Sequence, residues 1–336
     1  MHVDQITVSA HQVGALIIDQ VPSLAGQAIV PVDSGGTVNA IFRIGDTATA
    51  RFPLRNGDPD QLLSRLRSEF EASAEFVRAC PVPAPTPLHV GHPGHGYPLP
   101  WTVQSWVAGT PATPSGHEHS TALAVELAVV IDRLRACDTR GRRFEGAGRG
   151  GRLGDHDEWV ADSIARSEGL LDVDAGRALW SRFRILPRED PDLMCHSDLT
   201  PSNVVVTDGH LAGLLDTGGF QPADPALDLV VAWHLFAEPA RATLRRSLDC
   251  SDLEWRGARH GRSSRPSAPT GTTETRTRRC PRWREPPSTG SPLIGPERRR
   301  APARGSWSSS GIRGEPEHEV LLHTVVVPQR CRRDDL

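Results

Sequence analysis

Three polar side chains in the segment 193–219 are of types that could act together on a phosphate group. Asp198 and Asn203 belong to the run 196–203 (HSDLTPSN), and Asp216 follows thirteen residues after Asn203. A carboxylate can accept the proton of an attacking hydroxyl, whereas an amide oxygen and a second carboxylate suit magnesium, a hard cation that takes oxygen ligands. Such a set fits phosphoryl transfer, in which a metal bridges the phosphates and neutralises developing charge.

The elements around these residues are expected to bring them to one point. Two apolar strands, 204–206 and 211–215, flank a short turn at 207–210. A hairpin of this kind places the loop before its first strand beside the end of its second strand. We therefore expect Asp198 to act as the base and Asn203 and Asp216 to hold Mg2+, while His196 packs and hydrogen-bonds the loop.

The wider pattern resembles the aminoglycoside phosphotransferase family. The family signature runs His-Gly-Asp-x4-Asn, Ile-Asp-Trp-Gly and Asp-Pro-x-x-Asp-Leu, and the chain has matching segments at 196–203, 215–218 and 224–229. Ser197 stands where the family has glycine and Thr217 where it has tryptophan, and neither change removes a required oxygen. We interpret Asp224 as the N-cap of a helix at 225–236 and Asp228 as a support for the catalytic loop.

The resemblance covers about residues 1–255 and implies an α+β, two-lobed protein-kinase-like fold. Residues 1–105 would form a β-rich, nucleotide-binding N-lobe, and residues 106–255 a helical, catalytic C-lobe that is incomplete. The resemblance also implies an enzyme that moves the γ-phosphoryl group of ATP or GTP to a hydroxyl of a small molecule, with Mg2+ as cofactor. An aminoglycoside is the first candidate substrate, which would make the enzyme an antibiotic-resistance factor, but other family members use choline, homoserine or sugar-type alcohols, and fold analogy does not decide among them.

The N-terminal half contains residues that the resemblance assigns to nucleotide binding. Gly35 and Gly36 lie in a hairpin, 32–46, that looks like the family's nucleotide-covering hairpin, because glycines let the backbone approach phosphates. Arg51 falls where the family places the basic residue that binds phosphates. Glu69 is expected to pair with Arg51, with Glu71 as the alternative on the same helix.

The stretch 101–109 (WTVQSWVAG) resembles the strand and hinge between the lobes, where backbone groups, here of Ser105 and Val107, would read the purine edge. Trp101 and Trp106 are interpreted as packing residues. Periodicity predicts a meander of strands over 29–54, a second hairpin over 86–107, and helices over 59–79, 120–137, 156–170 and 175–186.

The charged residues are unusual in kind and uneven in distribution. The chain contains no lysine, so all 38 residues counted as Lys+Arg are arginine, and arginine must make any phosphate contact that lysine makes elsewhere. Residues 1–255 carry 21 Arg and 33 Asp+Glu, a balance of −12, whereas residues 256–336 carry 17 Arg and 8 Asp+Glu, a balance of +9. An acidic body suits a cationic substrate and argues against nucleic acid as a partner. The alternative, that the acidic residues serve only to keep the protein soluble, is equally open.

The sequence also bears on location. No apolar run approaches the length that crosses a membrane, and the N-terminus lacks the basic start and apolar core of a signal peptide. The six cysteines are scattered without a CxxC pair, so we expect reduced thiols. These features favour a cytoplasmic protein with no membrane partner, and they leave the oligomeric state open.

The character of the sequence changes at about residue 256. Residues 256–310 contain only two aliphatic residues larger than alanine, Leu293 and Ile294, which predicts an aperiodic, disordered tail over 256–336. Two explanations are open, a natural disordered tail or a reading-frame shift near codon 255, and we favour the second. A frameshift would favour the alternative of a non-catalytic remnant that binds nucleotide at best. A third hypothesis, a metalloprotein using His117 and His119, lacks an obvious third ligand.

Overall fold

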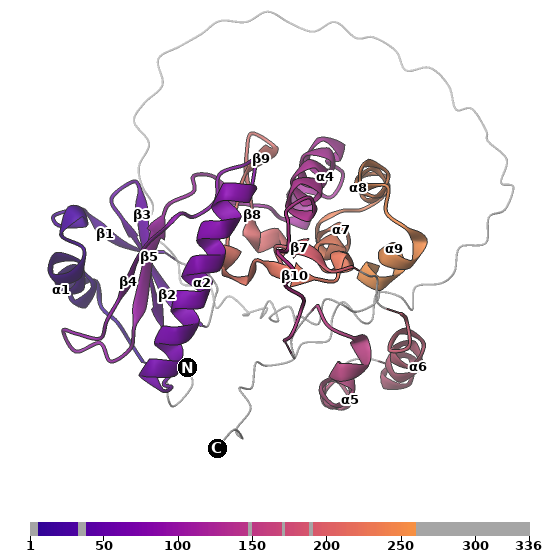
Figure 1. Ribbon diagram of the computed structural model, residues 1–336, viewed down its shortest axis with the longest axis horizontal. Helices are drawn as coiled ribbons and strands as arrows, with labels where there is room; N and C mark the ends of the chain where they lie inside the picture. Colours follow the sequence, from indigo (N-terminus) through magenta and orange to yellow (C-terminus); the bar gives the residue numbers. More distant parts are fainter. Residues whose placement is uncertain (1–5, 33–37, 147–149, 170–171, 188–190, 260–336) are drawn as a thin grey trace, which may run out of the picture.

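The computed structural model describes residues 6–32, 38–146, 150–169, 172–187 and 191–259. The N-terminal part is built on a β-sheet, and the part that follows is mainly helical. Figure 1 shows these two bodies with the long helix α2 lying between them. The α+β, two-lobed fold expected from the sequence is confirmed.

The N-terminal sheet is antiparallel, with strand order β1-β2-β3-β5-β4. Its strands are β1 Ile29–Val32, β2 Asn39–Ile44, β3 Ala48–Pro53, β4 Pro87–Gly91 and β5 Trp101–Ser105. Both predicted hairpins are present, and the second strand of the later one ends at Ser105 rather than at Val107. Because side chains alternate along a strand, β3 buries Ala50 and Phe52 in the core and directs Arg51 to the opposite face.

Aromatic rings fill the core of this sheet. Phe52 is stacked on Trp101 with ring centroids 5.0 Å apart, and it makes edge contacts with Phe42 and Tyr97. The Tyr97 hydroxyl donates to the carbonyl of Pro53 at 2.7 Å, and burial raises the pKa of this phenol. Trp101 is fully buried, which confirms its interpretation as a packing residue.

A helix that the sequence analysis did not predict covers one side of the sheet. Helix α1 (Ala10–Gln20) begins with a capping box, in which Ser9 Oγ accepts from the amide of Gln12 and the Gln12 side chain accepts from the amide of Ser9. Val13, Leu16 and Ile17 are its buried residues and join the core of the sheet. Their helical spacing and the capping box were visible signals.

Helix α2 (Pro59–Ala79) has the bounds predicted from the sequence. Asp58 caps it by accepting from the amides of Asp60 and Gln61. The apolar stripe predicted for it was Leu62, Leu63, Leu66, Phe70, Ala74 and Val77. The structure buries Leu66 and Phe76, so the predicted stripe missed the most enclosed side chain of the helix, Phe76.

The second body packs helices around short strands. Its helices are α3 Pro114–His117, α4 Thr121–Arg135, α5 Asp157–Arg166, α6 Val173–Phe183, α7 Val231–Leu235, α8 Ala240–Leu248 and α9 Asp252–Arg259. Its strands are β6 Thr110–Pro111, β7 Leu193–Cys195, β8 Val204–Thr207, β9 His210–Leu214 and β10 Gln221–Ala223. Short 3-10 helices are η1 Pro22–Leu24 in the first body and η2 Leu153–His156, η3 Pro201–Asn203, η4 Thr217–Gly219 and η5 Pro225–Val230 in the second.

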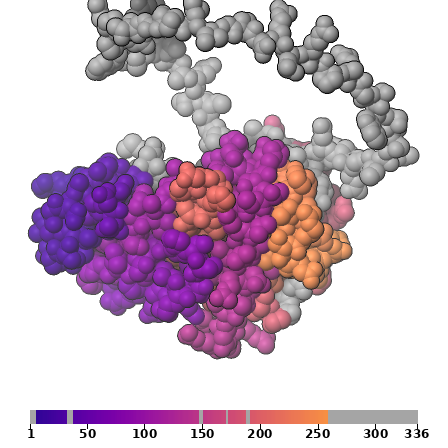
Figure 2. All heavy atoms as spheres, turned by 90° about the horizontal axis from the view of Figure 1, so that it is seen from above, coloured from indigo at the N-terminus to yellow at the C-terminus, as the bar shows by residue number. Residues whose placement is uncertain are grey.

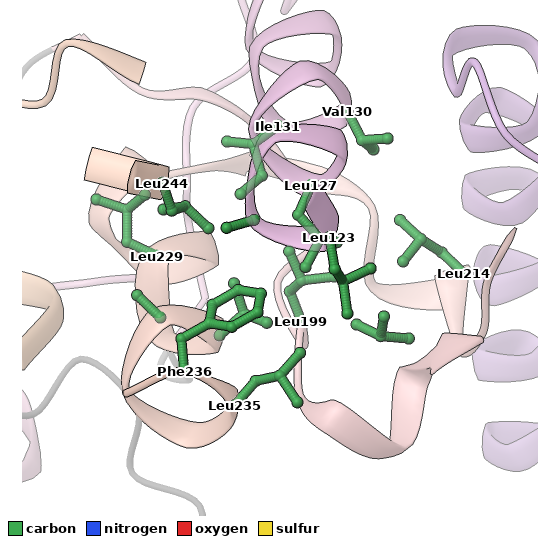
Figure 3. Packing of buried hydrophobic residues seen from close by; sticks show 14 of the residues in the cluster. Leu123, Leu127, Val130, Ile131, Leu199, Leu214, Leu229, Leu235, Phe236 and Leu244 are labelled. Atoms are coloured by element: carbon green, nitrogen blue, oxygen red, sulfur yellow. The ribbon is translucent and has the colours of Figure 1, made fainter. Parts of the chain in front are cut away.

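The core of the second body is largely aliphatic and is centred on α4. Figure 3 shows side chains of α4 packed over Leu199, Leu235 and Phe236. Leu199 lies in the catalytic loop proposed from the sequence, and it is fully buried. The loop is therefore anchored in the core of the second body and not laid over its surface.

The segment 225–236 differs from the single helix predicted for it. It is a 3-10 helix, η5, followed by the short helix α7. The predicted cap is confirmed, because Asp224 Oδ1 accepts from the amide of Ala226 at 2.9 Å. Asp228 lies in η5, and its carboxylate bonds to the catalytic loop.

Helix α9 ends the described part of the chain, and it crosses residue 255, where the sequence changes character. In Figure 2 the orange segment of α8 and α9 lies on the side of the molecule away from the indigo N-terminal part. The predicted disordered tail lies outside the described residues from residue 260 onward. None of the helices in the described ranges combines the length and apolar character needed to cross a bilayer.

Candidate active site

The loop between β7 and β8 is shaped by hydrogen bonds through His196. Its Nδ1 accepts from the amide of Asp198 at 3.3 Å, and its Nε2 donates to the carbonyl of Leu215 at 2.9 Å. The ring is fully buried and lies edge-on to Phe76 of α2, with centroids 5.4 Å apart. These contacts confirm that His196 packs and hydrogen-bonds the loop.

Asp228 fixes the start of the same loop. Its Oδ2 accepts from the amide of His196 at 2.7 Å, and its Oδ1 accepts from the amide of Ser197 at 2.9 Å. The side chain is 1% exposed, and burial raises the pKa of its carboxyl. The interpretation of Asp228 as a support for the loop is confirmed.

Ser197 has a left-handed backbone, with φ of 71°. Residues other than glycine, asparagine and aspartate rarely adopt this conformation, because the Cβ atom crowds the backbone. The glycine of the family signature at this position therefore has a physical reason, and the serine of this chain is strained there.

Asn203 bonds directly to Asp198. Its Nδ2 donates to the Asp198 carbonyl at 2.8 Å and to Asp198 Oδ2 at 3.1 Å. Both residues are buried, and each has 8% of its surface exposed. Because Nδ2 is committed to Asp198, the amide oxygen Oδ1 is the Asn203 atom able to ligate a cation.

The backbone of Leu215 joins Asp216 to this unit. Its amide donates to the Asn203 carbonyl at 2.8 Å, while its carbonyl accepts from His196. Asp216 follows with φ of 57°, a left-handed conformation that aspartate tolerates better than most residues. The structure thus brings Asp198, Asn203 and Asp216 together through one hydrogen-bonded network.

Arg51 reaches this network from the N-terminal sheet. Its Nη1 and Nη2 donate to Asp216 Oδ1 at 3.3 and 3.2 Å. The pair with Glu69 expected from the sequence is thus replaced by a pair with Asp216, while the Glu69 carboxylate lies 3.7 Å from Arg65 Nε on its own helix. The i, i+4 spacing of Arg65 and Glu69 explains this choice of partner.

Glu69 nevertheless belongs to the same charged group. Burial raises the pKa of its carboxyl, opposed by the positive charges of Arg65 and Arg51 and reinforced by the negative charge of Asp216. Glu71, the alternative, is exposed. A Cβ atom placed on Gly218 would lie 3.0 Å from the Cβ of Glu69, so this glycine lets helix α2 approach the turn that follows Asp216.

The two hinge residues differ in their surroundings. The Ser105 amide donates to the carbonyl of Thr86 at 2.8 Å, and Ser105 Oγ accepts from the amide of Thr86, so the Ser105 N–H is committed to the chain itself. Val107 packs where Gly213 has no side chain, since a Cβ atom there would lie 2.6 Å from Val107 Cγ1. Of the two, Val107 remains the residue whose amide could face a purine.

Gly35 and Gly36 lie outside the described residues. The strands β1 and β2 that bound their segment are paired up to Val32 and Ile41. The nucleotide-covering role of these glycines stays a prediction.

Two residues near the site were missed by the sequence analysis. Phe76 contacts both His196 and Phe220, with ring centroids 5.4 and 5.2 Å apart. Arg135, at the end of α4, donates to the carbonyl of Pro225 at 2.7 Å and to Glu254 of α9 at 2.6 Å. Phe76 could have been found from its place in the amphipathic helix, whereas no local pattern marks Arg135.

The donor atoms at the site fit a magnesium ion with few protein ligands. Within the described ranges, no group of three or more His, Cys, Asp or Glu side chains is placed to hold a metal. Magnesium commonly takes one or two protein oxygens and completes its shell with water and substrate phosphates. Asn203 Oδ1 and the Asp216 carboxylate, beside Asp198, supply such a set.

A family model described as "Phosphotransferase enzyme family" matches residues 29–260. The chain belongs to this family. The match includes the sheet, the catalytic loop and helix α9, and it makes the protein a member of a family of phosphotransferase enzymes. A search of curated proteins found no match to the sequence.

Solved structures of phosphotransferases have a similar fold. The GDP and kanamycin complex of APH(2")-IIIa is 19% identical, with a TM-score of 0.59, and the match covers 75% of this chain and 87% of that chain. The streptomycin–ATP–APH(2")-IIa ternary complex is 16% identical, with a TM-score of 0.54 and coverage of 76% and 86%. Macrolide 2'-phosphotransferase MphH from Brachybacterium faecium is 16% identical, with a TM-score of 0.52 and coverage of 74% and 86%. At these identities the likeness shows the fold alone.

Proposed function

We propose that the protein transfers the γ-phosphoryl group of ATP or GTP to a hydroxyl group of a small molecule. The observation that carries this proposal is the network in which Asn203 bonds to Asp198 while Leu215 joins Asn203 to His196. It supports the proposal because it joins one loop that carries a carboxylate, an amide oxygen and a second carboxylate, the groups that phosphoryl transfer uses.

Each residue has a defined part in the proposed reaction. Asp198 orients the substrate hydroxyl and accepts its proton as the hydroxyl oxygen bonds to the γ-phosphorus. The bond from that phosphorus to the β–γ bridging oxygen breaks, which leaves ADP or GDP and a phosphate ester. Asn203 and Asp216 hold Mg2+, which neutralises charge on the phosphates when bound. Arg51 binds phosphate oxygens with its forked guanidinium.

The N-terminal body supplies the rest of the nucleotide site in this proposal. Gly35 and Gly36 cover the phosphates, and the backbone of Val107 reads the purine edge. Glu69 positions Arg51 through its charge. The solved relatives of the fold include GDP and ATP complexes, so both donors are candidates.

The acceptor is proposed to be a cationic small molecule, with an aminoglycoside as the first candidate. Residues 1–255 carry 21 Arg against 33 Asp+Glu, a balance of −12, which attracts cations. The solved structures of similar fold include a kanamycin complex, a streptomycin complex and a macrolide phosphotransferase, so a panel of aminoglycosides and macrolides is the appropriate screen. We place the protein in the cytoplasm, where both nucleotides occur and where the described thiols would stay free.

Thermal shift with nucleotide and magnesium tests the first step. ATP or GTP with Mg2+ should raise the Tm of the full chain, and Asp216→Ala should abolish the magnesium-dependent part of the shift. Asp132→Ala, on an exposed position of α4, is the control and should behave as the wild type.

Phosphate transfer to the antibiotic panel tests the second step. Phosphorylated product that disappears in Asp198→Asn is the expected result. A folded protein without magnesium-dependent stabilisation by either nucleotide would refute the phosphotransferase proposal. Stabilisation without transfer to any acceptor, in a panel extended to choline and sugar alcohols, would favour the nucleotide-binding remnant.

A further inference from the structure

One ion pair crosses between the two bodies at the candidate site. Arg51 extends from β3 of the N-terminal sheet, and both of its terminal nitrogens donate to a single oxygen of Asp216 in the second body. The side chains are 25% and 40% exposed, so incoming solutes can reach both. The phosphate-binding cation and the metal-binding carboxylate of the proposed site are thus each other's partners.

The backbone at the carboxylate end of this pair is fixed in place. The backbone of Leu215, just before Asp216, is bonded on one side to Asn203 and on the other to His196. Just after it, Gly218 lies against Glu69 so closely that a Cβ atom would lie 3.0 Å from the Cβ of Glu69. The backbone of Asp216 therefore cannot shift without disturbing the loop.

The cationic end of the pair is the movable one. The backbone of Arg51 is paired with Ile41 on one side and Thr102 on the other, but its long side chain can change direction. Arg65 and Glu69 complete the group, which holds two positive and two negative charges.

We propose that the Arg51–Asp216 ion pair exchanges partners on ligand binding, so that the site accepts nucleotide and divalent cation together and resists either alone. A divalent cation by itself would meet the Arg51 guanidinium at the carboxylate that it needs. A polyphosphate by itself would meet the carboxylates of Asp216 and Glu69. When both arrive, Arg51 moves to phosphate oxygens and Asp216 binds the metal, so each charge keeps an opposite partner. This inference rests on the proposed function of the site.

The exchange predicts that each of two variants gains affinity for one ligand. If the substitutions only removed a ligand-binding group, no gain would be expected. Arg51→Gln should bind Mn2+ in the absence of nucleotide about tenfold more tightly than the wild type, within the usual range of coupling between sites. Asp216→Asn should bind ATP in the presence of EDTA more tightly than the wild type, again by about tenfold. Each variant gains affinity for one ligand alone because it frees the partner of the lost charge.

Titration calorimetry on the full chain measures these affinities, with Mn2+ alone and with ATP in EDTA as probes. The Mn2+ gain of Arg51→Gln should vanish in the double variant with Asp216→Asn, which locates the metal at Asp216. Arg177→Gln, which breaks a comparable exposed ion pair with Asp174 on α6, is the control and should leave both affinities unchanged. Circular dichroism and Tm verify that each variant is folded.

The outcomes separate the exchange from the proposed function. Unchanged or weaker Mn2+ binding in Arg51→Gln, or unchanged or weaker metal-free ATP binding in Asp216→Asn, overturns the exchange. If Arg51→Gln does not fold, the Asp216→Asn arm decides alone. Failure of the wild type to bind ATP even with Mg2+ refutes the proposed function instead, while the Mn2+ arm still reports whether Arg51 competes for Asp216.

Discussion

The two bodies of the molecule are stabilised by cores of different kinds. The N-terminal core contains a cluster of four rings, in which Phe52 is stacked on Trp101 and makes edge contacts with Phe42 and Tyr97. The core of the second body is aliphatic, and buried polar residues of the catalytic loop are built into it. The first body extends one long side chain, Arg51, to the candidate site, whereas the second holds several groups there through buried hydrogen bonds.

Helix α2 shows where the division between the bodies falls. By chain order it belongs to the N-terminal part, and Leu62 at its start packs against the core of the sheet. Phe76 near its end is buried in the core of the second body, against His196 and Phe220. The end of this helix thus packs with the catalytic loop, and Arg51 reaches the same loop from the sheet.

The largest loss of stability is expected where the end of α2 packs in the core of the second body. Phe76→Ala should lower the free energy of unfolding by about 3–5 kcal/mol, since it opens a cavity beside the loop. Leu62→Ala, at a half-buried position of the same helix, should cost about 1 kcal/mol. Urea unfolding measures both, and equal costs would contradict the assignment of the end of α2 to the catalytic body.

The next effect tests the rigid polar network. Asp228→Asn should cost about 3 kcal/mol, because an amide offers one acceptor to two buried N–H groups and leaves one unsatisfied. It should also weaken binding of nucleotide with magnesium. Asp172→Asn is the matched control, since Asp172 accepts from two amides at the exposed start of α6 with one oxygen, which asparagine can replace.

A penalty in that control of similar size to that of Asp228→Asn would show that burial is not the cause. Denaturant midpoints and nucleotide titrations of both variants supply the comparison.

A smaller effect tests the contact between α2 and the Asp216 turn. Gly218→Ala should cost about 1–3 kcal/mol, because its Cβ would press on Glu69 at 3.0 Å and the helix backbone has limited room to give. Gly57→Ala, with no atom within 4 Å of the added carbon, should be neutral or slightly stabilising. Thermal denaturation of the two variants distinguishes them, and equal Tm values would argue against a close approach of α2.

The smallest effect is a gain. Ser197→Gly should raise the free energy of unfolding by about 0.5 kcal/mol, because relief of the left-handed serine, about 1 kcal/mol, is partly offset by the greater freedom of glycine in the unfolded chain. Ser202→Gly, in the 3-10 helix of the same loop, has no such strain and should be destabilising. If Ser197→Gly also destabilised the protein, its backbone would not be under the strain that its φ of 71° implies.

The features predicted correctly from the sequence are those that local residue patterns encode. The predicted bounds of helix α2 match the structure, and the hairpin expected to bring Asp198, Asn203 and Asp216 around one loop is present. Helix α1 was not predicted, although Ser9 and Gln12 supply its capping box and its apolar residues have helical spacing.

What the sequence could not predict depends on contacts between distant residues. The choice of Asp216 over Glu69 as the partner of Arg51 joins positions 165 residues apart, and no local spacing encodes it. The 3-10 winding of η5 likewise follows from the reach of Asp228 back to the catalytic loop. Propensity alone favours an ordinary helix there.

The guanidinium at Arg51 has a consequence for how such a protein is detected. Nucleotide probes that carry an acylating group mark phosphate-binding sites by forming an amide with a nearby lysine amine. Arginine stays protonated and is a poor nucleophile, and this chain has no lysine anywhere. Surveys that rely on such labelling would pass over this protein even when its site is occupied.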